Sequence, residues 1–244
     1  MKGSQFAREN AKLPEGARDS FAAQAEAAFR QFVLRPEFPC LGAKAAFNSG
    51  AYTLRVYGEL GTCISTNELS ANLYDFTQSE VRDASDYATF VAIFERPRET
   101  DEIQFETLLW QQLRALHQHD ALHFTWDPNV RSDPADPHFS FSFGGQALYV
   151  IGLHANSSRE ARRFPWPALV FNPHEQFERL RADGKWQRMQ ETIRVRDLEL
   201  QGTINPMLSD FGEQSEARQY SGRAVGENWR APFKAIERKC PFAH

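Results

Sequence analysis

Two short apolar runs in the second half of the chain most constrain its fold. Residues 147–153 (ALYVIGL) and 168–171 (ALVF) consist almost entirely of aliphatic and aromatic residues. Apolar runs of about four to eight residues are typical of strands buried on both faces of a sheet. We therefore expect a central sheet with helices packed against it.

The rest of the sequence predicts the other elements of such a fold. Alternating, β-rich patterns predict strands over residues 52–58, 87–94 and 139–143, and two glycines at 144–145 predict a turn. Apolar positions at helical spacing predict helices over residues 17–32, 43–48, 67–81, from 100 onward, 173–184 and 185–198. The predicted fold class is α/β (α+β), a single domain with a central mixed or mostly antiparallel sheet flanked by helices.

Three helix starts are marked by local signals. Asn67 is a plausible N-cap, and Asn172 followed by Pro173 combines a capping residue with a proline at the first helical position. Thr100 opens the helix with the clearest apolar stripe. The stripe consists of Ile103, Leu108, Leu109, Leu113 and Leu116, and Phe105 and Trp110 flank it.

The chain shows no internal repeat and no linker that would divide it. We expect a flexible N-terminus over residues 1–15, one domain over residues 16–235 and a C-terminal tail over residues 236–244. Residues 127–137, rich in proline and aspartate, predict a loop that is a candidate lid or rim of a site.

The composition argues against several classes of protein. The 244-residue chain has a formal net charge of −4, so it lacks the basic character that nucleic-acid binding needs. Its three cysteines are too few for a disulfide framework, which indicates a reducing compartment. We find neither a signal-peptide pattern nor the run of about 20 apolar residues that spans a bilayer. We therefore expect a cytoplasmic protein that binds neither nucleic acid nor membrane.

The densest polar cluster follows the first apolar strand. His154 could ligate a metal or carry a proton. Arginine side chains grip carboxylates and phosphates through two parallel hydrogen bonds, so this cluster is a candidate anion site. A solvated basic turn is the alternative. The cluster contains His154, Ser157, Ser158, Arg159, Arg162 and Arg163.

A second candidate, His174, follows the next apolar strand. A helix start lowers the pKa of a histidine, so a neutral His174 could ligate a metal. A buried, hydrogen-bonded histidine is the alternative. Because His154 and His174 follow neighbouring strands, we expect them to lie in one shared site.

A third polar cluster occupies residues 200–223, where periodicity is weak. Asp210 and Glu216 could pair with a cationic amine or guanidinium. A solvated surface loop is the alternative. The directional polar side chains of this cluster are Asn205, Asp210, Glu216, Arg218, Gln219, Tyr220, Ser221 and Arg223.

Several common catalytic motifs do not occur in the sequence. It has no C-x-x-C, no H-E-x-x-H, no phosphate-binding glycine loop and no G-x-S-x-G elbow. A non-haem metal hydrolase is therefore a weak alternative. A thiolate-ligated haem would need a cysteine in an electropositive pocket, and Cys40 could serve there.

Taken together, four longer segments resemble the YqcI/YcgG family. Residues 38–43 (F-P-C-L-G-A) fit as well, so the resemblance covers most of the chain from about residue 35 to 233. The segments are 154–164 (H-x-x-S-S-R-x-A-R-R-F), 170–181 (V-F-N-P-H-E-Q-F-E-R-L-R), 200–208 (L-Q-G-x-x-N-P-M-L) and 215–223 (S-E-A-R-Q-Y-S-G-R).

Two positions depart from the family pattern. Ala231 stands where the family usually has the cysteine of W-x-C-P-F, which argues against a required thiolate there. Ala155 follows the first histidine, where the family often has proline.

The resemblance implies a function. Studied members of the family are haem-dependent N-oxygenases that hydroxylate an amine or guanidine nitrogen of an amino acid. It implies haem b as cofactor, an arginine-like amino acid and dioxygen as substrates, an external electron donor, and a histidine ligand to the iron. We expect this ligand to be His154, with His174 as second choice. A homodimer is compatible with these expectations, and a non-catalytic haem-binding sensor or carrier is the competing interpretation.

The same resemblance assigns roles to residues of the three clusters. Arg159, Arg162 and Arg163 would bind the haem propionates. The full implied sets are, for the cofactor, Cys40, His154, Ser158, Arg159, Arg162, Arg163 and His174; for the substrate, Asn205, Asp210, Glu216, Gln219, Ser221 and Arg223; and for catalysis, His174, Glu216, Arg218 and Tyr220.

Overall fold

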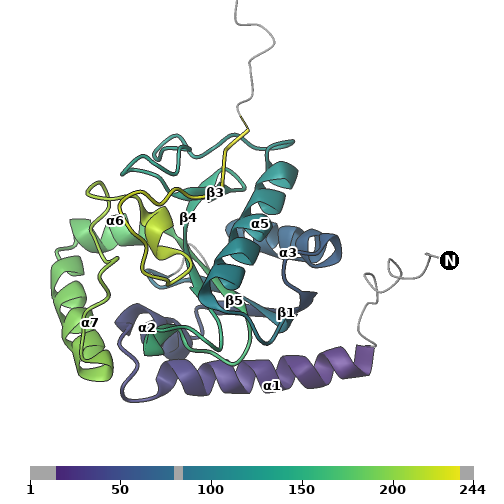
Figure 1. The fold of residues 1–244 in the computed structure, drawn as a ribbon, viewed down its shortest axis with the longest axis horizontal. Helices are drawn as coiled ribbons and strands as arrows, with labels where there is room; N and C mark the ends of the chain where they lie inside the picture. The colour runs from purple at the N-terminus through teal and green to yellow at the C-terminus, as the bar shows by residue number, and fades with distance from the viewer. Residues whose placement is uncertain (1–14, 80–84, 237–244) are drawn as a thin grey trace, which may run out of the picture.

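A single five-stranded mixed sheet forms the centre of the protein (Figure 1). The computed structural model describes residues 15–79 and 85–236, so the expected N-terminal segment and C-terminal tail lie almost entirely outside it. The strands run in the order β1-β2-β5-β4-β3; β1 and β2 are parallel, and the other neighbouring pairs are antiparallel. The predicted fold class is confirmed. The strands are β1 (Tyr52–Glu59), β2 (Thr89–Arg96), β3 (Phe141–Phe143), β4 (Gln146–Leu153) and β5 (Ala168–Pro173).

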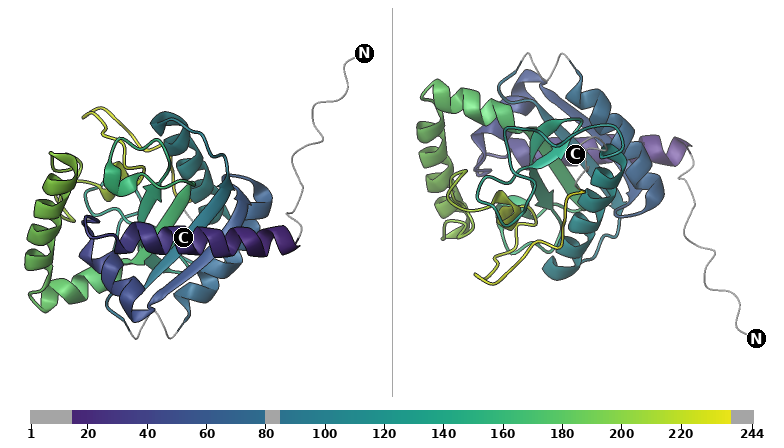
Figure 2. Two further views of the ribbon diagram at one scale, coloured as in Figure 1. Left: turned by 90° about the horizontal axis from the view of Figure 1, so that it is seen from below. Right: turned by 90° about the horizontal axis from the view of Figure 1, so that it is seen from above.

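Helices cover both faces of this sheet. Figure 2 shows α1 in front of the sheet in one view and behind it in the other. Within the described residues, α1 and α2 share one apolar core with the sheet, and α3 and α5 share the other. The helices are α1 (Glu15–Leu34), α2 (Leu41–Ser49), α3 (Cys63–Thr77), α5 (Glu102–Asp120), α6 (His174–Ala182) and α7 (Trp186–Gln201), and the short 3-10 helices are η1 (Glu160–Arg162) and η2 (Glu216–Gln219).

Side-chain alternation along the strands divides the two cores. In β2, Phe90 and Phe94 pack with α3 and α5, whereas Val91 and Ile93 pack with α1 and α2. Successive side chains of a strand point to opposite faces, so a strand covered on both faces must be apolar at every position. This is why β2 carries an unbroken apolar run.

Helix α5 begins as its sequence predicts. Asp101 accepts a hydrogen bond from the Gln104 backbone N–H, and the Gln104 side chain accepts one from the Asp101 backbone N–H, which together form a capping box. Leu109 and Leu113 are fully buried, but Ile103 is 64% exposed. The predicted burial of Ile103 is wrong because its side chain faces solvent, whereas Phe105 in the same turn is fully buried.

Two predicted helix caps are also wrong. Thr62, not Asn67, caps α3 by accepting a hydrogen bond from the Ser65 backbone N–H. The expected end of this helix near Val81 lies outside the described residues. Asn172 and Pro173 are the last residues of β5, and the Asn172 side chain donates to the Tyr149 carbonyl instead of capping α6. Sheet pairing overrides the local capping signal there.

Helices α6 and α7 project from the edge of the body (Figure 1). Among the side chains of α7, Asp197 is the one that is buried. The segment after Gly202 returns to the body and ends in η2. Helix α7 therefore covers the body through few apolar contacts. No helix within residues 15–79 and 85–236 combines the length and apolar character that crossing a bilayer requires.

Candidate functional site

A cavity of about 290 Å³ lies between the sheet and its α1–α2 cover. Its walls come from α1, α2, the cavity-facing side chains of β4 and β5, η1, α6, α7 and the segment leading to η2. In β4, Tyr149, Ile151 and Leu153 line it, as strand alternation requires. The predicted loop 127–137 is a loop, but its residues do not line this cavity.

His174 lies in the cavity wall at the point where β5 ends and α6 begins. Its ring packs edge-on against Phe211, with ring centroids 4.4 Å apart, and against Phe177. Burial lowers the pKa of His174 below its usual value. The imidazole is therefore neutral at pH 7, the state in which histidine binds a metal.

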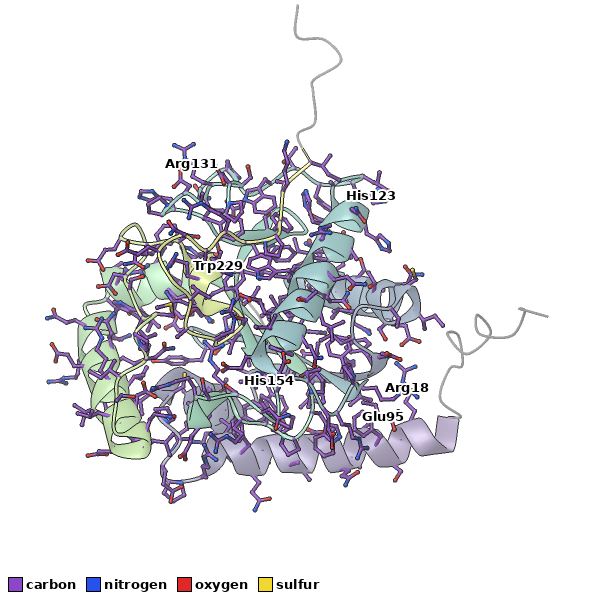
Figure 3. The ribbon with its side chains drawn as sticks, in the orientation of Figure 1. Arg18, Glu95, His123, Arg131, His154 and Trp229 are labelled. Atoms are coloured by element: carbon purple, nitrogen blue, oxygen red, sulfur yellow. The ribbon has the colours of Figure 1, made fainter. Side chains whose placement is uncertain are left out.

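His154 lies on the other side of the sheet. Leu153 faces the cavity, so the next side chain points toward α5, and Figure 3 shows His154 near the N-terminal end of that helix. The His154 ring stacks on Phe105 with centroids 4.5 Å apart, and neither ring nitrogen forms a hydrogen bond of normal geometry. Burial lowers the pKa of His154. It does not line the cavity.

The structure does not bring the two predicted ligands together. β4 and β5 are antiparallel, with Leu153 opposite Ala168 and Leu148 opposite Pro173. The end of one strand therefore lies beside the start of the other, which separates the two ends by roughly 17 Å along the sheet at about 3.4 Å per residue. The expectation of one shared histidine site is wrong for this reason.

Only part of the predicted arginine cluster lies in the cavity wall. Arg159 lines the cavity, and its guanidinium forms an ion pair with Asp197 and donates to the Thr203 hydroxyl and carbonyl oxygens. Arg162 also lines the cavity. Arg163 donates from Nε to the Ser157 carbonyl and does not line it.

Ser158 does not line the cavity either. Its hydroxyl donates to the Glu102 carboxylate at 2.7 Å, so it joins the loop to the first turn of α5. This contact is structural and leaves the hydroxyl directed away from the cavity wall.

Cys40 lines the cavity as the N-cap of α2. Its sulfur accepts a hydrogen bond from the Ala43 backbone N–H. Burial raises the pKa of the Cys40 thiol. The side chain is therefore a neutral thiol at pH 7, which makes it a poor candidate for a thiolate ligand.

The 3-10 helix η2 brings Glu216 and Gln219 into the cavity wall. The Tyr220 hydroxyl donates to Glu216 Oε1 at 2.8 Å and accepts a hydrogen bond from the Phe141 backbone N–H at 3.0 Å. Burial raises the pKa of Glu216 to about 8. Glu216 is thus largely protonated at pH 7, and the Tyr149 hydroxyl donates to neighbouring Gln219 at 2.7 Å.

The third predicted cluster is split between the cavity and the opposite side of the sheet. Asn205 and Asp210 line the cavity, and Gln190 of α7 donates to Asp210. Ser221 and Arg223 instead bind the Glu106 carboxylate of α5. Arg218 donates to the carbonyls of residues 225 and 226 and does not line the cavity.

Several cavity residues were missing from the sequence predictions, among them Tyr149 and Asp197. Tyr149 lies two positions from Ile151 on the same strand face, so strand alternation could have revealed it. Asp197 follows Met189 and Ile193 at intervals of four residues, which places a carboxylate on the apolar face of a helix. Among the described residues, no three His, Cys, Asp or Glu side chains converge on a position suited to a metal ion.

The fold and the site define a single α/β domain with one histidine, two buried arginines and a protonated glutamic acid around an apolar cavity. The chain belongs to the YqcI/YcgG family, whose model matches residues 29–234. It is 30% identical over 194 residues to the Bacillus subtilis (strain 168) protein named "Uncharacterized protein YqcI", a match that covers 75% of each chain. No solved structure matches it significantly. The family resemblance of the four motifs is therefore confirmed.

Proposed function

We propose that this protein is a haem-dependent oxygenase that hydroxylates an amine or guanidine nitrogen of an arginine-like amino acid. The observation that carries the proposal is the buried, neutral imidazole of His174 in the wall of an apolar cavity. Neutral imidazole is the common protein ligand of haem iron. His174 therefore replaces His154 as our first choice of iron ligand.

The chemistry of the cavity wall suits a porphyrin. Aromatic side chains supply apolar faces, and Arg162 supplies a positive charge of the kind that matches a propionate. These faces come from Phe29, Phe32, Phe47, Phe177, Trp186 and Phe211.

The volume of the cavity adds a structural requirement. About 290 Å³ is just below the usual range of ligand pockets, roughly 300–1,000 Å³, and haem b is a large ligand. Among the helices that line the cavity, α7 has the fewest buried side chains. It is therefore the helix expected to move outward when the cofactor binds.

Glu216 is suited to handle the proton of the substrate nitrogen. A protonated amine has no lone pair, so it must lose a proton before its nitrogen can form a bond to oxygen. Glu216 lines the cavity, and the Tyr220 hydroxyl holds its Oε1 in place, so its carboxyl can exchange a proton with a bound ligand. Only the ionised form of Glu216 accepts this proton, and a carboxyl with a pKa of about 8 is ionised to roughly a tenth at pH 7. When bound, haem supplies the activation of dioxygen with electrons from an external donor.

Reconstitution with haem tests the proposal. A Soret band of a histidine-ligated haem is expected, and its absence would overturn the proposal. Turnover is then measured with arginine and lysine analogues, a reductant and dioxygen, with detection of a product that has gained one oxygen on nitrogen. A Soret band without turnover of any nitrogen compound would instead support a non-catalytic haem sensor or carrier.

A further inference from the structure

We propose that the inner wall of the cavity holds a carboxylate subsite centred on Arg162. The ligand group is a monoanionic carboxylate, which belongs either to a cofactor propionate or to the amino-acid substrate. The choice of these two ligands rests on the proposed function, whereas the subsite itself is inferred from the contacts of Arg162.

Arg162 is a buried cation with neutral hydrogen-bond partners. Its side chain lines the cavity, and the whole residue is 9% exposed. The guanidinium donates to the carbonyl oxygens of Gly152 at 3.1 Å, Gln219 at 3.2 Å and Tyr220 at 3.4 Å. These three bonds use three of the five N–H groups of a guanidinium, so two remain.

The positive charge of Arg162 is not balanced by a neighbouring anion. Within residues 15–79 and 85–236 it takes part in no ion pair, and the carboxylate of Asp197 is already bound to Arg159. Of the other ionisable groups that act on it, Arg159 is itself positive, and Tyr149 and Cys40 both have pKa values raised by burial and are neutral at pH 7.

An isolated buried charge is costly, and most side chains escape the cost by losing or gaining a proton. Arginine does not take this route because its guanidinium stays protonated in proteins. Carbonyl dipoles compensate part of the charge, and a bound anion would supply the rest. One positive charge in an apolar wall matches a monoanion, and the planar guanidinium matches the planar carboxylate.

The guanidinium is also held in place before any ligand binds. Gly152 accepts from Arg162, and its backbone N–H donates to the Tyr220 carbonyl at 2.7 Å, so two of the three acceptors are joined to each other. Gly222, at φ +84°, lies so close that a Cβ there would be 3.3 Å from Arg162 Cγ. A fixed side chain loses little conformational freedom on binding, which favours a specific site.

The other buried arginine of the cavity wall shows the contrast. Arg159 has the same residue type and the same cavity, but Asp197 neutralises it at 2.5 Å. The geometry therefore singles out Arg162 rather than the arginine cluster as a whole.

Small-molecule binding to the haem-free full chain tests the subsite. Sodium propionate and its neutral isostere propionamide are titrated by calorimetry and by NMR. Propionate is expected to bind, propionamide to bind at least tenfold more weakly, and Arg162→Met to weaken propionate at least tenfold. The exposed Arg188→Gln on α7 serves as the matched control and is expected to bind propionate as the wild type does. Equal binding of propionate and propionamide, or unchanged binding by Arg162→Met, would overturn the proposal.

A second variant and a titration of the haem-loaded protein complete the test. If Arg162→Met does not fold, Arg162→Lys retains the charge without the planar fork, and unchanged propionate binding by that variant would overturn the proposal. Repeating the titration on haem-loaded protein separates the sources: loss of propionate binding assigns the subsite to the cofactor, and retained binding assigns it to the substrate. Because the main titration needs no haem, a missing Soret band would leave this result standing.

Discussion

Arg159 and Asp197 form an ion pair that joins η1 to the helix covering the cavity. Arg159 Nη2 lies 2.5 Å from Asp197 Oδ2, and the two side chains are 10% and 7% exposed. The same carboxylate oxygen accepts the Asn205 backbone N–H at 2.9 Å. One carboxylate therefore holds both α7 and the segment that follows it against the body.

Asp197→Asn is expected to loosen this cover. The change leaves Arg159 charged and buried without its partner, which typically costs about 3 kcal/mol of unfolding free energy. Urea denaturation measures the loss, and hydrogen exchange is expected to accelerate in α7 but not in α5. Asp183→Asn, which breaks the exposed pair with Lys185, is the control and should change neither measurement. Equal exchange in the two variants would contradict this account of the cover.

Glu216 is expected to make the stability depend on pH. Its pKa rises from an ordinary value of 4.5 to about 8 on folding. Between these values the unfolded state has lost the proton and the folded state keeps it, so stability is highest below pH 4.5 and falls as pH rises toward 8. The fall is about 5 kcal/mol at most, and Glu216→Gln is expected to remove it.

The informative quantity is the difference between the two stability curves. The buried histidines titrate in both proteins and cancel in that difference. Wild type and Glu216→Gln are therefore compared by urea denaturation from pH 5 to pH 9. Parallel curves would show that Glu216 is ionised in the folded protein.

Gly152→Ala is expected to destabilise the protein through overpacking. A Cβ at this position would lie 2.7 Å from both Leu109 Cδ1 and Phe105 Cε1, and 2.8 Å from the Tyr220 carbonyl oxygen. Forcing a methyl group into such a site costs about 1–3 kcal/mol. At Gly226 a Cβ meets no atom within 4 Å, so Gly226→Ala should leave the midpoint of thermal unfolding nearly unchanged.

His154→Leu is expected to leave the fold intact. The substitution removes two buried nitrogens that lack normal hydrogen bonds and keeps an apolar contact with Phe105, so the change in unfolding free energy at pH 7 should stay below about 1.5 kcal/mol. Burial lowers the pKa of His154, so wild-type stability falls as pH drops below 6.5, and the variant should gain relative stability at pH 5. Loss of haem binding by this variant would show that His154, contrary to our assignment, is needed for haem binding.

Local sequence patterns predicted most elements of the fold because their causes are local. The apolar stripe of α1 and the unbroken run of β2 are fixed by burial at regular spacing. Local patterns gave wrong predictions where tertiary contacts favoured a different local structure. Asparagine is a common helix N-cap, but Asn172 pairs with Tyr149 of the neighbouring strand and therefore stays in the sheet.

The candidate site was harder to predict than the fold. Strand alternation alone separates Leu153 from His154, so the placement of His154 away from the cavity follows from its own strand. The distance between His154 and His174 follows from the antiparallel pairing of β4 and β5, which no local pattern encodes. The separation of Glu216 from Arg223 depends on the turn of η2, which has no apolar periodicity to reveal it.

Substitution of His174 tests whether its imidazole ligates the haem iron. His174→Gly removes the imidazole from the cavity wall, and added imidazole can occupy the space that remains. We expect the haem-reconstituted wild type to show the absorption and EPR spectrum of a histidine-ligated haem. We expect His174→Gly to lose that spectrum and added imidazole to restore it. An unchanged spectrum in His174→Gly, with a folded protein by circular dichroism, would contradict the assignment of His174 as the ligand.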